Sequence, residues 1–157
     1  MAREFSAGGV VLRRMQGRWW VAVIEPQRKP TPGVAKRRPV LALPKGLVDQ
    51  GEKPEDTALR EVREETGVEA ALVCKLHDIK YVYVRPWGDR QRVFKVVSFY
   101  LLLYRGGKLG EIRPDMRHEV RRAQWLPLEE AARQLSYGGE RDMVKLAEEY
   151  VAAHPEL

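Results

Sequence analysis

Residues 46–68 constrain this chain more than any other segment, because they combine a well-marked helix with an unusual charge pattern. Pro54 suits the first helical position, and the two acidic residues after it place negative charge near the positive end of the helix dipole. Gly67 is a typical residue just beyond a helix end. The sequence therefore predicts a helix over 54–66 with a loop on either side.

The polar side of this helix carries three glutamates whose carboxylates are neighbours. Glu61, Glu64 and Glu65 stand at positions i, i+3 and i+4, apart from the apolar arc that is expected to be buried. Like charges at this spacing destabilise a helix by about 0.2–0.5 kcal/mol per pair, so they call for solvent screening or a cation. Mg²⁺ prefers carboxylate oxygens, and Glu52 in the preceding loop could supply a fourth one. A solvated face with Arg60 paired to Glu64 is the alternative interpretation.

The rest of the chain predicts strands before, between and after helices. Strands are expected over 5–12, 19–24, 71–84, 92–104 and 123–126, and further helices over 128–135 and 142–153. This order predicts the α/β class with a mixed sheet. The length and the lack of a linker predict a single domain over residues 1–157.

Residues 25–40 interrupt this pattern with a run that is rich in proline and basic residues. Four prolines and five basic residues exclude a regular element, so a loop is expected. It is either a solvated insertion or a basic flap over a phosphate site. The formal charge of +6 favours anionic partners, although a basic surface by itself also serves solubility.

Composition excludes several classes of protein. A single cysteine, Cys74, excludes an internal disulfide and a metal site built from cysteines. No apolar stretch approaches the ~18 residues of a membrane span, and the N-terminus lacks a signal-peptide pattern. A cytoplasmic protein with no membrane partner is therefore expected, either as a monomer or as a homodimer.

The segment around the predicted helix resembles the signature of the Nudix hydrolases. That signature reads Gly, five residues, Glu, seven residues, Arg-Glu, an apolar residue, any residue, Glu-Glu, any residue, Gly and an apolar residue. Its fixed positions are filled by Gly46, Glu52, Arg60, Glu61, Val62, Glu64, Glu65, Gly67 and Val68. The resemblance implies a Nudix-type α/β/α sandwich with a mixed central sheet. It also implies hydrolysis of a nucleoside diphosphate linked to another group, with Mg²⁺ or Mn²⁺ as the cofactor.

The resemblance further implies roles for the residues at matching positions. Glu61, Glu64 and Glu65 would bind the metal, and either Glu61 or Glu65 would be the general base. Arg60 would orient these glutamates through a charge-assisted hydrogen bond, and Glu52 would add a further ligand. The catalytic group implied is thus Arg60 with the three helix glutamates.

One more metal ligand is expected from a position outside the signature. Glu119 comes just before a predicted strand, where related enzymes often supply an additional metal ligand or base. Because His118 and Glu119 would also suit an exposed turn, both interpretations stay open at this point.

Most of the chain, from about residue 5 to residue 150, resembles the small bacterial diadenosine polyphosphate hydrolases. That resemblance implies a tyrosine stacked on adenine and lysines on the polyphosphate, with diadenosine tetraphosphate cleaved to ATP and AMP. Alternating tyrosines on a strand more often serve packing, so this interpretation has a structural alternative. The substrate-binding residues expected on this basis are Lys45, Gly46, Tyr81, Tyr83 and Lys95.

Three other functions fit the same signature. The first is hydrolysis of an oxidised nucleoside triphosphate such as 8-oxo-dGTP. In that reaction water attacks a different phosphorus, and the signature does not specify which phosphorus is attacked. An RNA 5′-end pyrophosphohydrolase would agree with the basic loop and would show a steep salt dependence. A non-catalytic nucleotide-sensing module is least expected, because every glutamate of the signature is present. A small nucleotide is thus the expected partner, with RNA as the alternative.

Overall fold

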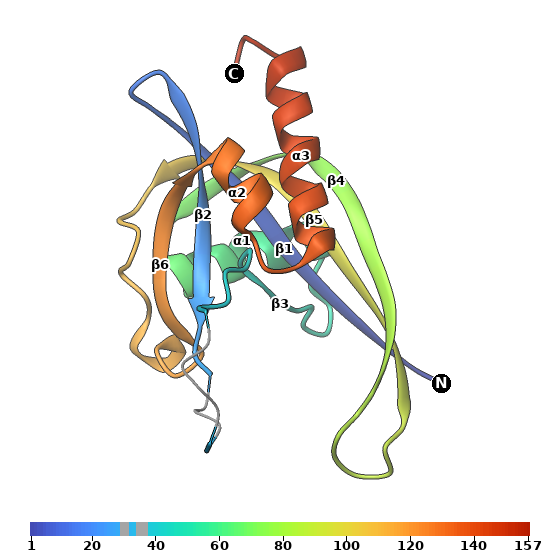
Figure 1. The fold of residues 1–157 in the computed structure, drawn as a ribbon. Coiled ribbons are helices and arrows are strands. Elements are labelled where there is room, and N and C mark those ends of the chain that lie inside the picture. The colour runs from blue at the N-terminus through green and yellow to red at the C-terminus, as the bar shows by residue number, and fades with distance from the viewer. Residues whose placement is uncertain (29–31, 34–37) are drawn as a thin grey trace.

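The computed structural model describes residues 1–28, 32–33 and 38–157 (Figure 1). The expected loop over 25–40 lies partly outside these described residues. Its described ends, beyond β2, carry no helix or strand. The elements are β1 (Ala2–Met15), β2 (Arg18–Pro26), β3 (Lys45–Leu47), α1 (Pro54–Thr66), β4 (Glu69–Val84), β5 (Arg92–Gly106), the 3₁₀ turn η1 (Pro114–Met116), β6 (Val120–Pro127), α2 (Leu128–Gln134) and α3 (Gly138–Ala153).

The strands form one mixed sheet, as the sequence predicts. Its order is β4-β5-β1-β2-β6, and β3 pairs with the first half of β1. The β1–β5 pair is parallel, whereas the other strand pairs are antiparallel. A two-residue turn joins β1 to β2, with positive φ at Gln16 (54°) and Gly17 (73°), which is the geometry that matches strand twist.

Helices cover both faces of this sheet, so the predicted α/β sandwich is confirmed (Figure 1). One apolar cluster includes Val10 and Leu12 of β1 and packs under α2 and α3. A second cluster includes Val11 and packs under α1 with Val62, and a smaller third one is formed by Ile24, Ala42, Ile112 and Val120. Alternate residues of β1 thus pack into the clusters on opposite faces of the sheet, because successive side chains along a strand point to opposite faces. The 13-residue helix α1 is thereby fixed against the middle of the sheet.

Several elements differ from the sequence-based expectation. The three-residue strand β3 was not expected, because Pro44 and Gly46 interrupt its apolar run. Helix α3 begins at Gly138 rather than at residue 142, so that Gly138 and Gly139, which have low helix propensity, lie in its first turn. A Cβ atom on Gly139 would lie 2.7 Å from Ile79 Cδ1, so the small residue lets α3 approach β4. No helix in the described ranges is long and apolar enough to cross a membrane.

Candidate active site

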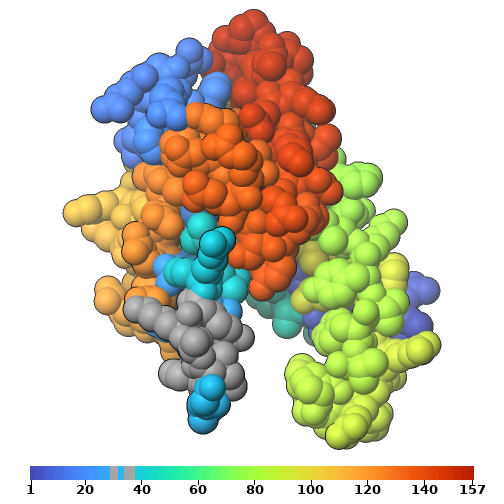
Figure 2. All heavy atoms as spheres, viewed as in Figure 1, coloured from blue at the N-terminus to red at the C-terminus, as the bar shows by residue number. Residues whose placement is uncertain are grey.

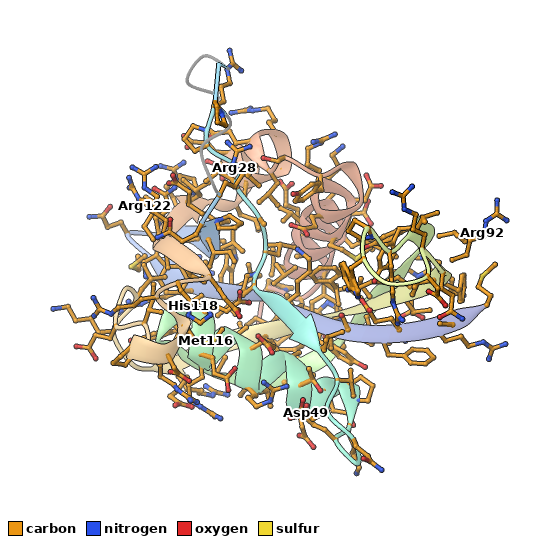
Figure 3. All side chains as sticks on the ribbon, turned by 90° about the horizontal axis from the view of Figure 1, so that it is seen from below. Arg28, Asp49, Arg92, Met116, His118 and Arg122 are labelled. Carbon is orange, nitrogen blue, oxygen red and sulfur yellow. The ribbon has the colours of Figure 1, made fainter. Side chains whose placement is uncertain are left out.

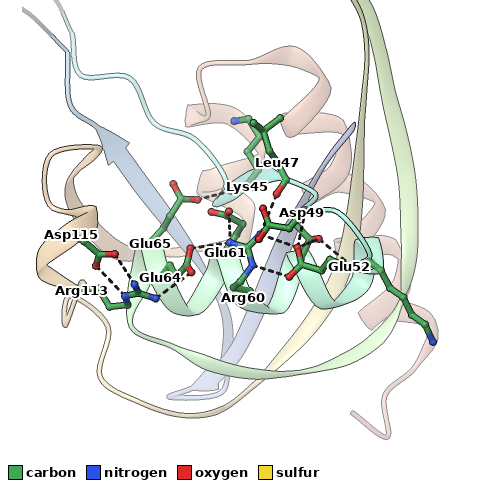
Figure 4. Close-up of polar contacts among 12 residues, drawn as sticks. Lys45, Leu47, Asp49, Glu52, Arg60, Glu61, Glu64, Glu65, Arg113 and Asp115 are labelled. Carbon is green, nitrogen blue, oxygen red and sulfur yellow. Dashed lines mark hydrogen bonds and ion pairs between the residues drawn. The ribbon is translucent and has the colours of Figure 1, made fainter. Parts of the chain in front are cut away.

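Arg60, in the middle of α1, is the centre of a polar network that joins this helix to the loop before it (Figure 4). Its Nε and Nη2 donate to the two carboxylate oxygens of Glu52 at 2.8 and 2.9 Å, and Nη2 also donates to the Leu47 carbonyl at 3.1 Å. The hydrogen bonds from Arg60 lower the pKa of Glu52 to about 2, and the Glu52 carboxylate in turn raises the pKa of Arg60. This bidentate pair fixes the loop before α1 onto the helix.

The same guanidinium reaches two of the helix glutamates. Its Nη1 donates to Glu61 Oε1 at 3.0 Å and to Glu64 Oε2 at 3.1 Å. From the other side, Arg113 Nη1 lies 3.3 Å from Glu64 Oε1, and its remaining nitrogens bind Asp115. The structure therefore brings Glu52, Arg60, Glu61 and Glu64 together, as the sequence predicts, and adds Arg113.

Glu61 and Glu65 are the two buried members of the group, with 8% and 6% exposure. Burial raises the pKa of Glu61, and burial together with the charge of Glu61 raises the pKa of Glu65 to about 8. Glu65 Oε1 accepts the backbone N–H of Lys45 at 2.7 Å. Glu61 lies against Gly46 of β3, where a Cβ atom would overlap the carboxylate. Both side chains thus sit between α1 and β3.

Glu119 lies in an exposed turn directly before β6, with its Oε1 3.6 Å from His118 Nε2. Its negative charge contributes to the raised pKa of both Glu61 and Glu65. Glu119 therefore acts electrostatically on these two glutamates, although it is more than 50 residues further along the chain.

The donor set of this site suits a hard divalent cation. In this partly buried region the carboxylates of Glu52, Glu61 and Glu64 contact the guanidinium groups of Arg60 and Arg113, and Glu65 lies beside Glu61 with a raised pKa. Mg²⁺ and Mn²⁺ favour such oxygen ligands. In the described part of the chain, no three His, Cys, Asp or Glu side chains are gathered around one point, and Arg60 bridges Glu61 and Glu64 instead.

A cleft of about 490 Å³ opens on the α3 side of β3. In Figure 2 the surface is hollowed beside the β4–β5 hairpin, below α2 and α3. Tyr81 and Tyr137 line the cleft together with the aliphatic side chains of Ile79 and Val97. An apolar, aromatic slot with few polar groups is typical of a small-molecule site.

Lys45 connects this cleft to the buried carboxylates. Its Nζ donates to Glu140 Oε2 at 2.7 Å, whereas its backbone N–H binds Glu65. Glu140 is 3% exposed, and its other oxygen accepts the Leu43 N–H at 2.7 Å. The Lys45 ammonium also lies 5.6 Å from the centre of the Tyr137 ring.

Two of the expected substrate-binding residues have other partners in the structure. Tyr83 Oη donates to Glu4 Oε2 at 2.9 Å, and Lys95 Nζ donates to Glu4 Oε1 at 2.6 Å. Neither is among the described residues that line the cleft, whereas Lys45 and Tyr81 are. Neither Tyr137 nor Glu140 was assigned a role in the site from the sequence. The available signal was an acidic residue in the first turn of a helix next to a tyrosine, which is too common to be diagnostic.

The metal-free protein is expected to lose stability as the pH rises from 5 to 8. Glu65 has a pKa of about 8 in the folded state against an ordinary 4.5, so the folded state retains a proton that the unfolded state has lost. Its contribution is fully present below pH 4.5 and is lost as the pH rises through 8. Thermal melts in EDTA should show Tm falling over this window, and saturating Mg²⁺ should oppose the fall.

The variant Glu65→Gln is the control for this pH dependence, because it removes the titrating group and keeps the side-chain size. Its Tm in EDTA should vary less between pH 5 and 8 than that of the wild type. A wild-type Tm that rises over the window, or equal slopes in the two proteins, would contradict the assignment to Glu65.

Comparisons with known proteins agree with the fold. A solved Ap4A hydrolase structure from C. elegans, a binary complex, superposes with a TM-score of 0.72 at 20% identity, covering 96% of this chain and 98% of that one. A MutT NUDIX hydrolase structure from Burkholderia pseudomallei gives a TM-score of 0.65 at 20% identity and covers 93% of this chain and 98% of that one.

Curated relatives show closer sequence similarity. The "Putative mutator protein MutT4" of Mycobacterium tuberculosis is 36% identical over 150 residues, which are 94% of this chain and 56% of that protein. The asymmetrical bis(5′-nucleosyl)-tetraphosphatase of Mus musculus is 40% identical over 92 residues, 56% of each chain. This chain thus spans little more than half the length of these relatives. Residues 3–147 match the NUDIX domain, which is most of the sequence. The chain therefore belongs to the NUDIX domain family.

Proposed function

We propose that this chain, with residues 1–157 acting as one domain, is a divalent-metal-dependent pyrophosphohydrolase of nucleoside diphosphate derivatives. The favoured substrate is a dinucleoside polyphosphate such as diadenosine tetraphosphate, cleaved to ATP and AMP. The observation that carries the proposal is that Lys45 joins the two halves of the site. Its backbone binds the buried Glu65 of α1, and its ammonium lies in the aromatic cleft.

The metal would be held by Glu61, Glu64 and Glu65, with Glu119 as a further ligand from the turn before β6. When bound, Mg²⁺ or Mn²⁺ neutralises phosphate charge and stabilises the oxygen that leaves. We propose a positioning role for Glu52, since both of its oxygens are bonded to Arg60 in this structure.

The chain's own residues supply the proton transfer and the orientation. Glu61 or Glu65 takes a proton from the attacking water as its oxygen bonds to phosphorus, and the bridging P–O bond breaks toward the leaving phosphate. We favour Glu65 of the two, because in the metal-free protein burial and the neighbouring Glu61 raise its pKa and so make its carboxylate the stronger proton acceptor. Arg60 holds Glu61 and Glu64 in register. The Lys45 ammonium offers a positive charge to a phosphate that enters from the cleft.

An oxidised nucleoside triphosphate is the second candidate substrate. It is favoured by a relative from Mycolicibacterium smegmatis named 8-oxo-(d)GTP phosphatase, which is 34% identical over 104 residues, 66% of this chain and 29% of that protein. The dinucleoside polyphosphate is preferred because the mouse relative carries that activity in its name at the higher identity of 40%, and because the cleft offers Tyr81 and Tyr137 to a nucleobase. RNA remains the alternative partner on the basis of charge.

A parallel substrate panel tests the proposal. The protein is incubated with Mg²⁺ and either diadenosine tetraphosphate, 8-oxo-dGTP, ADP-ribose or 5′-triphosphorylated RNA, and products are separated by ion exchange. The expected result is the highest kcat/KM for diadenosine tetraphosphate, with ATP and AMP as products. If another substrate leads, the proposed specificity is wrong. If none is turned over with Mg²⁺ or Mn²⁺, the proposed activity is wrong.

The cleft tyrosines give a second expected result. Tyr81→Ala and Tyr137→Ala should each raise KM for diadenosine tetraphosphate about tenfold, because stacking on a base contributes about 1–3 kcal/mol. The kcat should change less, since neither ring contacts the carboxylates. Tyr104→Phe is the control, because its hydroxyl binds the Gly107 carbonyl away from the cleft. An unchanged KM in both alanine variants would contradict base stacking in this cleft.

A further inference from the structure

Much of the positive charge of this chain is concentrated beside β6. Two adjoining hollows share Arg122 on this edge strand. The ionisable residues that line them comprise five positive side chains and one negative, a sum of +4 against +6 for the whole chain. These residues are Arg38, Arg117, Arg121, Arg122, Arg133 and Glu25. An even distribution of surface charge for solubility would not produce such a local excess.

The hollow nearer to α1 is built rather than incidental. It has a volume of about 360 Å³, and we call it the β6 arginine hollow, after Arg117, Arg121 and Arg122, which line it with Gln27. Glu25 is 6% exposed and anchors two of them, with Arg121 Nη1 at 2.8 Å and Arg122 Nε at 3.9 Å. A buried carboxylate thus orients two exposed guanidinium groups, and Arg122 Nη2 also donates to Gln124 Oε1 at 3.2 Å.

The lining indicates which part of a ligand this hollow recognises. Guanidinium groups match the geometry of phosphate oxygens through paired hydrogen bonds. Among the described residues that line the two hollows there is no aromatic side chain. Sites that bind nucleobases along a strand combine positive charge with aromatic platforms. The β6 arginine hollow therefore suits phosphate groups and not bases.

The position of the hollow relates it to the candidate active site. Val120 lines it and follows directly after Glu119, whose charge acts on Glu61 and Glu65. Figure 3 shows Met116 and His118 beside α1, with Arg122 further along the same side of the molecule. The aromatic cleft lies on the α3 side of β3, and the hollow lies beyond Glu119. The two binding regions thus flank the carboxylates.

We propose that the β6 arginine hollow binds the phosphates of the substrate that lie beyond the scissile bond, while the aromatic cleft holds the nucleoside on the other side. This inference rests on the proposed function. It makes Arg117, Arg121 and Arg122 specificity-determining residues that favour long phosphate chains over short ones. The ligand class is an oligophosphate chain.

The first test measures binding without turnover. Tripolyphosphate is titrated into the protein in the presence of EDTA. Without a divalent metal the glutamates of α1 repel the anion, so that binding at the arginines is measured by itself. The Kd should rise at least about tenfold in the triple variant Arg117→Gln/Arg121→Gln/Arg122→Gln. The matched control replaces the exposed arginines Arg14, Arg92 and Arg105 by glutamine, which removes the same charge from other surfaces and should change the Kd less than about threefold. Equal losses in the two triple variants would overturn the proposal.

A second variant protects the test against misfolding. Replacing all three arginines leaves Glu25 buried without its partners, which can destabilise the sheet edge. Arg117→Gln/Arg122→Gln keeps the Arg121–Glu25 pair, and Arg14→Gln/Arg105→Gln is its charge-matched control. The double variant should still weaken tripolyphosphate binding at least about threefold more than its control. Equal affinities at unchanged Tm would overturn the proposal.

The second test measures chain-length specificity with Mg²⁺. The hollow variants should lower kcat/KM for diadenosine hexaphosphate about tenfold and for diadenosine triphosphate less than about twofold. Equal losses on both substrates would overturn the role in distal binding. Turnover without arginine-dependent binding defeats this inference and leaves the proposed activity intact. Arginine-dependent binding without any turnover defeats the proposed activity and, with it, the assignment of the hollow to substrate phosphates.

Discussion

Glu65→Gln is expected to lower the metal-dependent kcat on diadenosine tetraphosphate by about 10³-fold, within the range that general-base groups contribute. Glutamine keeps the size of the side chain and an oxygen for the Lys45 N–H, but it can neither take a proton nor bind Mg²⁺ as an anion. The same change removes a negative charge that is unfavourable in the folded state, because the side chain is buried and lies beside Glu61. The metal-free variant should therefore melt at a higher temperature than the wild type at pH 8.

This pairing of lost activity with gained stability separates a functional carboxylate from a structural one. Replacing a glutamate with a purely structural role would lower both the activity and the stability of the protein. Glu149→Gln on the exposed side of α3 is the control and should change neither quantity measurably. Retention of kcat by Glu65→Gln at saturating Mg²⁺ would contradict the assignment and move the general base to Glu61.

The sequence was sufficient for α1, because the determinants of that helix are local. Pro54 at its start and Gly67 at its end act through their own backbone preferences, and Gly67 indeed has a φ of 84°. The signature spacing also placed Glu61, Glu64 and Arg60 correctly relative to one another, since residues three and four apart on a helix are neighbours.

Contacts between distant segments were not predictable in this way. Lys45 and Glu140 are 95 residues apart, and nothing in either local sequence indicates that they form an ion pair. Likewise, Glu4 is 91 residues from Lys95, yet the parallel pairing of β1 with β5 places these two side chains together. Because many strand registers satisfy the same alternating pattern, a single sequence does not select this one.

The same limit explains why the expected substrate residues separate into two groups. Tyr81 and Tyr83 alternate on β4 and their ring centres are 6.2 Å apart, so both face the same side of the sheet. Only Tyr81 reaches the cleft, because the cleft is closed by Tyr137 and Glu140 of the α3 region, whose position depends on tertiary packing. Substrate contact by Tyr83 and Lys95 stays a prediction, and in this structure both side chains bind Glu4.

Gly46→Ala is expected to lower kcat/KM about 100-fold without changing any charged residue, since a misplacement of about 1 Å at a reacting group can have that effect. Gly46 is paired with Ala7 in the sheet, so its backbone suits alanine. The added Cβ would overlap the Glu61 carboxylate, which must then move away from β3 and from Arg60. The loss should thus arise from the position of Glu61. Gly106→Ala is the control, since nothing lies within 4 Å of a Cβ atom there, and it should retain wild-type activity.

A double-mutant comparison tests whether the glycine serves the carboxylate or the strand. In a Glu61→Ala background the space beside Gly46 is open, so adding Gly46→Ala should change Tm by less than about 2 °C. In the wild-type background the overlap with Glu61 should lower the free energy of unfolding by about 1–3 kcal/mol. Equal losses of Tm in both backgrounds would show that the strand itself requires glycine. Strongly unequal losses would tie Gly46, the first fixed position of the signature, directly to Glu61, and would give the physical reason why the signature begins with a glycine.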